Sequence, residues 1–157
     1  MSIFAPEAQA SYGTVRTVFV PRSAFDYWTG PSRREMSVTL SRGESVHELH
    51  DVYAERRDED ADGYGSAVAD VASFKLAQTI IENLPAGLPS PEPGVDPDGE
   101  ATLEWHAGPR RVLSVSVGAD HVLRYAAILG DESTSGRATL DGRSLPEVVS
   151  SLAYRTR

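Results

Sequence analysis

The stretch ATLEWHAGPRRVLSVSVGADHVLRYAAIL, residues 101–129, decides the fold, because apolar and polar side chains alternate along most of it. This period of two is typical of strands that bury one face, and it predicts strands at 101–106, 113–117 and 122–129. Gly108-Pro109 and Gly118 stand between these runs as turn residues. Because such short turns join antiparallel neighbours, the stretch predicts an antiparallel β-meander with Trp105 in the core.

Downstream of the meander, the sequence predicts one more strand and a closing helix. Residues 130–136 are polar and contain glycine, so a short fourth strand is expected only around 138–140. Ser144-Leu-Pro-Glu147 matches a capping box with proline in the first helical turn. The helix that follows is expected to bury four apolar side chains, namely Leu145, Val148, Val149 and Leu152.

Two helices are predicted upstream of the meander. Ser45-Val-His-Glu48 is a further capping-box match and predicts a short helix at 46–57 with an acidic outer face. A longer helix is expected to begin at Ser66 and to end near Asn83, because Pro85 follows. Its predicted buried stripe consists of Val68, Val71, Ala72, Leu76, Ile80 and Leu84, widened by Phe74, Ala77 and Ile81. Residues 85–99 contain five prolines and three glycines, so an irregular connector is expected there.

The first forty residues carry two more strand patterns around an aromatic loop. Residues 14–20 are rich in β-branched side chains, and residues 36–40 alternate between apolar and polar. Between them, Phe25, Tyr27 and Trp28 stand among prolines and glycines, where they either fill the core or anchor a protein interface. With the other elements this predicts an α+β fold: a meander of about four strands plus one or two N-terminal strands, packed against two or three helices.

The composition fits one folded domain spanning residues 1–157. Hydrophobic residues make up 40% of the chain and charged residues 24%, which are ordinary values for a globular protein. The chain contains no cysteine, which excludes disulfides and thiol catalysis and agrees with a reducing compartment. No apolar run approaches the roughly 20 residues that a membrane span needs, and the N-terminus has no secretory pattern, so a cytoplasmic location is expected.

Negative charge is concentrated in the middle third of the chain. The formal net charge is −8, yet residues 44–70 hold nine acids against Arg56 and Arg57, and residues 71–100 hold five acids against Lys75. The segments on either side are slightly basic. An acidic protein repels nucleic-acid phosphates and attracts basic protein surfaces, so we expect a protein partner and no direct nucleic-acid binding. This expectation requires that the central carboxylates form one exposed patch.

The candidate chemical motifs are incomplete. Asp58-Glu-Asp-Ala-Asp62-Gly63 matches the first half of a calcium loop, but Ala69 stands where the last carboxylate should be. His47 and His50 are spaced to share a metal ion on one helix, yet no cluster supplies a third ligand. The sequence has neither a Gly-x-Ser-x-Gly nucleophile elbow nor a phosphate-binding loop. We therefore expect a protein without catalytic activity, metal or cofactor.

A set of short motifs between residues 62 and 125 carries a resemblance. The motifs are Asp62-Gly-Tyr-Gly65, Leu84-Pro85 before the proline-rich connector, Asp98-Gly-Glu100, Leu103-Glu-Trp105, Arg111–Val117 and Arg124-Tyr125. In this order they resemble a family of small uncharacterised bacterial proteins whose genes often travel on mobile elements. The family usually has Trp and Asp before Gly-Tyr-Gly, where this chain has Asp60-Ala61. The resemblance implies that residues 62–157 form the shared part and that residues 1–60 are specific to this chain.

These observations lead to one preferred hypothesis for the function and two alternatives. The preferred hypothesis is a non-enzymatic inhibitor that docks on a basic, nucleic-acid-handling surface of a partner, an anti-CRISPR-like role. Glu55, Asp58, Glu59, Asp60 and Asp62 are the predicted contacts, with Phe25, Tyr27 and Trp28 as further anchors. The first alternative is an antitoxin-like or assembly partner that binds through an apolar face. The second is a divergent calcium-binding module built on residues 58–62.

Overall fold

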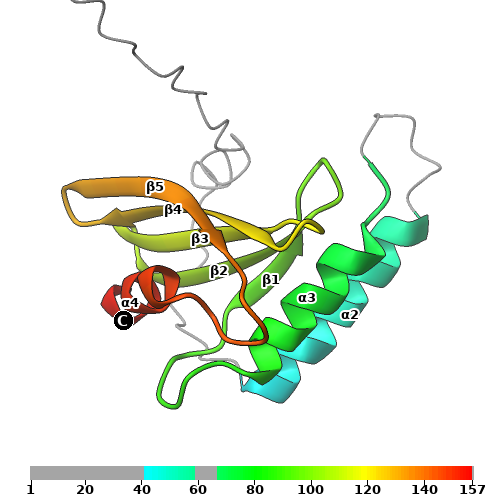
Figure 1. Cartoon of the computed structure of the whole chain (residues 1–157), viewed down its shortest axis with the longest axis horizontal. Helices are drawn as coiled ribbons and strands as arrows, with labels where there is room; N and C mark the ends of the chain where they lie inside the picture. The colour runs from blue at the N-terminus through cyan, green and yellow to red at the C-terminus, as the bar shows by residue number, and fades with distance from the viewer. Residues whose placement is uncertain (1–40, 59–66, 157) are drawn as a thin grey trace, which may run out of the picture.

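In the computed structural model, residues 41–58 and 67–156 are described, and this part forms three helices and one five-stranded antiparallel sheet (Figure 1). The predicted α+β class is therefore confirmed. The predicted strands at 14–20 and 36–40 and the loop with Phe25, Tyr27 and Trp28 lie outside the described residues. The elements are α2 (Arg42–Asp58), α3 (Val71–Glu82), β1 (Glu92–Val95), β2 (Ala101–Gly108), β3 (Arg111–Val117), β4 (Val122–Leu129), β5 (Glu132–Thr139) and α4 (Glu147–Arg155).

The sheet is a meander, because strands that follow one another in sequence are also neighbours in space. Its register places Leu103 opposite Val115 and Val115 opposite Tyr125, so apolar side chains form rows across one face. α3 and α4 pack on this inner face and share one buried core with the strands, while α2 lies beside α3 and against β1 (Figure 1). Trp105 is in this core as expected, and its indole N–H donates to the carbonyl oxygen of Pro89 at 2.8 Å.

Within the described ranges, none of the helices combines the length and the apolar character that crossing a bilayer requires.

Two strands differ from the sequence expectation. β1 lies inside the segment expected to be irregular, and Pro93 pairs with Leu103 in it. Proline is tolerated there because β1 is an edge strand, which forms a ladder on one side only. β5 begins at Glu132, well before the strand expected at 138–140. Most of its side chains are polar and exposed, so the sequence carries no period-two signal, although β4 provides a partner for each of its residues.

α3 begins at Val71 and not at Ser66, while its end agrees with the prediction because Asn83 is the C-cap. Asp70 is the N-cap, and its side chain accepts a hydrogen bond from the N–H of Ser73 at 2.8 Å. Such a cap satisfies one of the free amide groups of the first turn. Asp70 therefore stabilises the start of a helix, and its carboxylate is committed to that structural role.

The residues just before α3 are bound to the turn between β1 and β2 instead of being helical. The N–H of Ala67 donates to the carbonyl of Pro97 at 2.9 Å, and the N–H of Asp70 donates to that of Gly99 at 2.8 Å. Gly99 has a φ of +88°, and a Cβ added to it would lie 2.4 Å from the carbonyl oxygen of Val68. Only glycine fits at this close approach of the two backbones.

The buried face of α3 agrees with the prediction at Phe74, Ala77, Ile80, Ile81 and Leu84 and differs from it at the N-terminal end. Val68 and Val71, both assigned to the buried stripe, are 49% and 52% exposed. The pattern was ambiguous because apolar residues between positions 67 and 84 occur on more than one side of the helix. The residues that α3 and its C-terminal end bury are Ser73, Phe74, Ala77, Ile80, Ile81 and Leu84.

The starts of α2 and α4 also differ from the predicted capping boxes. The true capping box of α2 lies one turn earlier, because the Ser41 N–H donates to Glu44 Oε2 at 2.6 Å and the Glu44 N–H donates to Ser41 Oγ at 3.3 Å. α4 begins at Glu147 after Pro146, and no side chain caps it. Val148, predicted to be buried, is 43% exposed, whereas the three other predicted residues of this segment are buried: Leu145, Val149 and Leu152.

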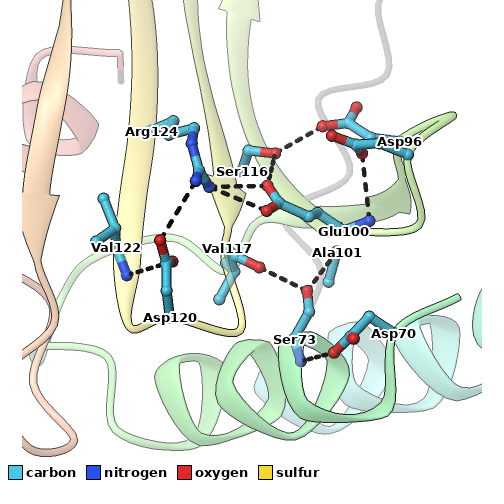
Figure 2. A network of polar contacts seen from close by, with 11 residues as sticks. Asp70, Ser73, Asp96, Glu100, Ala101, Ser116, Val117, Asp120, Val122 and Arg124 are labelled. Atoms are coloured by element: carbon cyan, nitrogen blue, oxygen red, sulfur yellow. Dashed lines mark hydrogen bonds and ion pairs between the residues drawn. The ribbon is translucent and has the colours of Figure 1, made fainter.

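Two fully buried serine hydroxyls attach the helices to the sheet. Ser45 Oγ in α2 donates to the carbonyl of Pro91 at 2.5 Å. Ser73 Oγ in α3 donates to the carbonyl of Val117 at 2.6 Å and accepts from the N–H of Ala101 at 2.7 Å (Figure 2). Each hydroxyl thus satisfies backbone groups at a point where the helix meets the sheet, and a buried backbone group without a partner would be costly.

We expect Ser73→Ala to lower the free energy of unfolding by about 1–3 kcal/mol, because it leaves two buried backbone groups without their hydrogen-bond partner. The matched control is Ser151→Ala on the exposed side of α4, which should change the free energy of unfolding by less than about 0.5 kcal/mol. Urea unfolding of both variants and of the parent chain measures the difference. Equal stability of the two variants would contradict the assigned role of Ser73.

Candidate functional site

A network of polar side chains lies on the outer face of the sheet, close to the turn between β1 and β2 (Figure 2). Arg124 on β4 is at its centre, because Nη1 contacts both carboxylate oxygens of Glu100 at 3.0 Å and Nη2 lies 3.5 Å from Oδ2 of Asp120. Ser116 on β3 donates to Oδ2 of Asp96 at 2.6 Å, with Oε2 of Glu100 as a second acceptor at 3.3 Å. The network therefore joins three carboxylates to one guanidinium group.

The excess of carboxylates affects Asp96 most. Asp96 is half-buried, and its pKa is raised from 3.8 to about 6, with desolvation by burial as the largest cause. The hydrogen bond from Ser116 lowers the pKa in part, and the negative charges of Asp98, Glu100 and Glu104 contribute smaller increases to the same net rise. Asp96 can therefore exchange a proton close to neutral pH, which an exposed aspartate does not do.

A second group of polar contacts lies two residue pairs further along β2 and β3. Glu104 Oε2 is 2.9 Å from Nε2 of His106, and Glu104 Oε1 accepts from the Ser114 hydroxyl at 3.2 Å. The hydrogen bond to Glu104 raises the pKa of His106, against the effect of its burial. His106 is thus bound to Glu104, while Ser116 is bound to Asp96, so the described residues do not form a Ser-His-Asp triad on this face.

A row of acidic residues runs along the exposed side of α2. Glu44, Glu48, Asp51 and Glu55 follow one another at spacings of four, three and four residues, which places them within an arc of about 60° on the helix. Glu48 is half-buried and the others are exposed. We call these four residues the α2 acidic stripe. The three arginines of α2 lie outside this arc: Arg42, Arg56 and Arg57.

Arg42 has a separate structural role at the start of α2. Its Nη2 donates to the carbonyl of Leu84 at 2.6 Å and to that of Pro85 at 3.3 Å. These carbonyls follow the end of α3, where backbone acceptors lack helical partners, so a guanidinium group is well placed there. The positive charge of Arg42 is therefore directed to the end of α3.

The structure describes only part of the predicted contact set. Glu55 is exposed on the α2 acidic stripe, beside Asp51, and Asp58 is the last residue of α2. The remaining predicted contacts lie outside the described residues: Glu59, Asp60, Asp62, Phe25, Tyr27 and Trp28. Glu44, Glu48 and Asp51 were not among the predicted contacts, although their helical spacing was a signal that could have included them.

The central carboxylates do not all share one role, as the expected single patch requires. Asp70 caps α3, and Glu100 is paired with Arg124 from the C-terminal third of the chain. The stripe residues are on a different element from the network on the sheet. The described acids therefore divide into a structural group, a partly neutralised network and one exposed stripe.

The histidines of α2 are engaged in other contacts. His47 Nε2 lies 3.5 Å from Asp51 Oδ2, and the ring of His50 packs edge-on against Phe74 with ring centroids 4.9 Å apart. In the ranges that the structure describes, no three His, Asp or Glu side chains are placed together as a metal site. The half calcium loop of residues 58–63 lies almost entirely outside those ranges.

We expect Asp96→Asn to stabilise the protein at pH 7.5 by about 1–2 kcal/mol, a value reduced for the partial solvent access of the carboxylate. The folded pKa of about 6 is higher than the unfolded value near 3.8, so the contribution of Asp96 to stability is present below pH 4 and is lost as the pH rises through 6. Asparagine keeps an acceptor for Ser116 and avoids the buried charge. Its advantage should therefore disappear below about pH 4.

Urea unfolding of the parent chain and the variant at pH 3.8 and pH 7.5 measures this difference. Asp141→Asn, at an exposed position after β5, removes the same charge and should show no such pH dependence. An advantage of Asp96→Asn that is equal at both pH values would contradict the raised pKa.

Comparison of the chain with protein-family models, with curated proteins and with solved structures finds no match in any of the three.

Proposed function

We propose that this protein is a non-enzymatic inhibitor that binds a basic surface on a protein partner, and that this surface otherwise holds nucleic acid. The observation that carries the proposal is the α2 acidic stripe, in which four acidic residues, three of them exposed, lie along one side of a helix. Along the helix axis the stripe is about 16 Å long. A partner with arginine and lysine side chains arranged for a phosphate backbone presents the complementary charge.

The sequence beyond the stripe supports a larger acidic surface. Asp58 ends α2, and Glu59, Asp60 and Asp62 follow it directly in the chain. Glu55 is the stripe residue nearest to these acids in sequence. It is the member of the proposed contact set whose side chain the structure describes. Opposed charges speed the encounter of two proteins and select the partner more than they add affinity. Competition with nucleic acid for one basic site would give the anti-CRISPR-like role that the sequence suggested.

The apolar alternative has less support from the described surface. An antitoxin-like partner would need a continuous apolar face, and the described residues include four exposed large apolar side chains, Val68, Val71, Val148 and Tyr154. Val148 and Tyr154 belong to α4, whereas Val71 is the first residue of α3 and Val68 precedes that helix. Tyr154 also uses its hydroxyl group to donate to the carbonyl of Ala86 at 2.9 Å. Charge is therefore the stronger basis for binding.

Neutralising the predicted acidic contacts should abolish partner capture. The test variant replaces five acids by their amides, Glu55→Gln, Asp58→Asn, Glu59→Gln, Asp60→Asn and Asp62→Asn, and is used to pull down proteins from an extract of the native host. We expect capture of a nucleic-acid-binding protein by the parent chain, and at least a tenfold loss with the variant, because steering by opposed charges is removed. Added nucleic acid should compete with the parent chain for the captured protein.

The control variant loses five exposed acids elsewhere, so its net charge changes equally: Asp98, Asp131, Glu132, Asp141 and Glu147. It should capture the partner as the parent chain does. Capture should also weaken between 0.1 M and 1 M salt, because the Debye length falls from about 10 Å to 3 Å. Unchanged capture by the test variant, or equal loss with the control variant, would exclude the acidic surface as the binding site.

The calcium alternative has its own test. A protein that binds calcium only when folded gains stability from excess calcium by mass action. We expect the melting temperature of the full chain to be the same in excess calcium and in excess chelator, since the loop lacks its last carboxylate. A calcium-dependent rise in the melting temperature, lost when Asp58 and Asp60 are replaced by Asn, would instead support the calcium module.

A further inference from the structure

One edge of the sheet is open in the described part of the chain. β5 pairs with β4 and with no other described strand, and residues 131–135 are all exposed. The opposite edge differs, because β1 contains Pro93 and packs against α2. Proline and a covering helix are two ways in which proteins protect an edge strand from pairing with another chain. β5 has neither of these protections among the described residues.

The backbone of β5 is regular enough to act as a template. It pairs with β4 through eight consecutive residue pairs without a register shift. The N–H of Leu140, which follows β5, donates to the carbonyl of His121 on the β4 side at 2.8 Å. Because antiparallel ladders alternate, the N–H and C=O groups of residues 133, 135, 137 and 139 point to the open edge. Four successive backbone positions are thus available to another strand.

The side chains of β5 leave room for a close neighbour. Except for Glu132 and Arg137, its residues are Ser, Thr, Gly and Ala. At Gly136, an added Cβ would lie 2.6 Å from the hydroxyl oxygen of Tyr125, so the tyrosine side chain crosses the sheet beside the glycine. Tyr125 thereby covers the inner side of β5 at Gly136.

The charge distribution makes a second copy of the chain a suitable partner for the open edge of β5. At the start of β5, Asp131 is paired with Arg110 at 2.7 Å and Glu132 with Arg155 at 2.9 Å, so this end is close to neutral. Arg137 adds a positive charge near the other end. The acidic residues of α2, β1 and the turn before β2 lie toward the opposite edge of the sheet (Figure 1). Two copies joined at β5 would therefore keep their acidic ends apart.

We propose that this protein forms a two-fold symmetric dimer in which β5 pairs antiparallel with β5 of a second copy, with the symmetry axis at Ser135. A two-fold axis perpendicular to the sheet pairs residues that share a face, so Ser135 faces its equivalent and Ser133 faces Arg137 of the second copy. In this register Asp131 is the diagonal neighbour of that arginine, within reach of its long side chain.

The proposed dimer is a continuous ten-stranded sheet with the two β1 strands at its outer edges. At about 4.8 Å per strand, β1 of one copy would be roughly 40 Å from β1 of the other. This separation is several times the Debye length of about 8 Å at physiological salt, so the acidic ends do not repel each other strongly. Both copies would keep the α2 acidic stripe exposed at the outside.

Single cysteines test the register, because the chain has no cysteine of its own. Under oxidised glutathione, Ser135→Cys should give a disulfide-linked dimer, since directly opposite residues of a ladder have Cα atoms about 5.5 Å apart, within disulfide range. Ser133→Cys is the matched control on the same edge. In the proposed register, position 133 of one copy lies opposite position 137 of the other, four residues away from the second position 133. We expect at least about tenfold less cross-linked dimer with the control, because the effective concentration of the second thiol is low there.

Analytical ultracentrifugation of the full chain measures the association without a cross-link. The parent chain should show a monomer–dimer equilibrium that does not weaken between 0.1 M and 1 M salt. Ser135→Pro removes an outward N–H and should raise the dissociation constant at least about tenfold, with circular dichroism checking that the fold is kept. A parent chain that is monomeric at every concentration, a dimer unaffected by Ser135→Pro, or equal cross-linking of both cysteine variants would overturn the proposal.

Discussion

The position of α3 on the sheet depends on one buried hydroxyl group, that of Ser73. This group completes the hydrogen bonding of Ala101 at the start of β2 and of Val117 at the end of β3, two residues that pair with each other in the sheet. The amide of Ser73 is held in turn by Asp70, which begins the helix. A helix start, two strand ends and the apolar face between them are therefore fixed around one side chain, and the alternating strands supply the surface on which α3 lies.

The sequence predicted well those elements whose burial is reflected in a simple period. β2, β3 and β4 have one buried face and one outer face, and the predicted ranges agree closely with the observed strands. β1 and β5 were missed or shortened because they are edge strands, where Pro93 and a run of small polar residues are tolerated. The start of α3 and the burial predicted for Val68 and Val71 were wrong because the start is set by hydrogen bonds to a turn that is distant in sequence. Local patterns contain no information on such contacts.

The candidate site shows the same division between local and distant information. The α2 acidic stripe follows from helical spacing alone, yet Glu55 is its one member among the predicted contacts, where it stood as the first of a run of acids that continues to Asp62. The network around Arg124 could not be predicted, because Glu100 reaches Arg124 on β4 and Asp96 reaches Ser116 on β3 only through the register of three strands. The raised pKa of Asp96 depends on burial, and burial is a property of the assembled sheet. The total charge of the middle third of the chain therefore predicted an acidic surface, but it could not predict the separate roles of the carboxylates there.

The contact between Gly99 and the carbonyl of Val68 has a consequence for how this fold can vary during evolution. The positive φ leaves no room for a side chain, and an added Cβ would collide with the Val68 carbonyl oxygen, so mutation at this codon is restricted even though neighbouring turn residues are exposed. The neighbouring Pro97 and Asp98 are exposed and face no such restriction. In any lineage that keeps the β1–β2 turn docked on the start of α3, a glycine at this point should persist while the residues around it diverge.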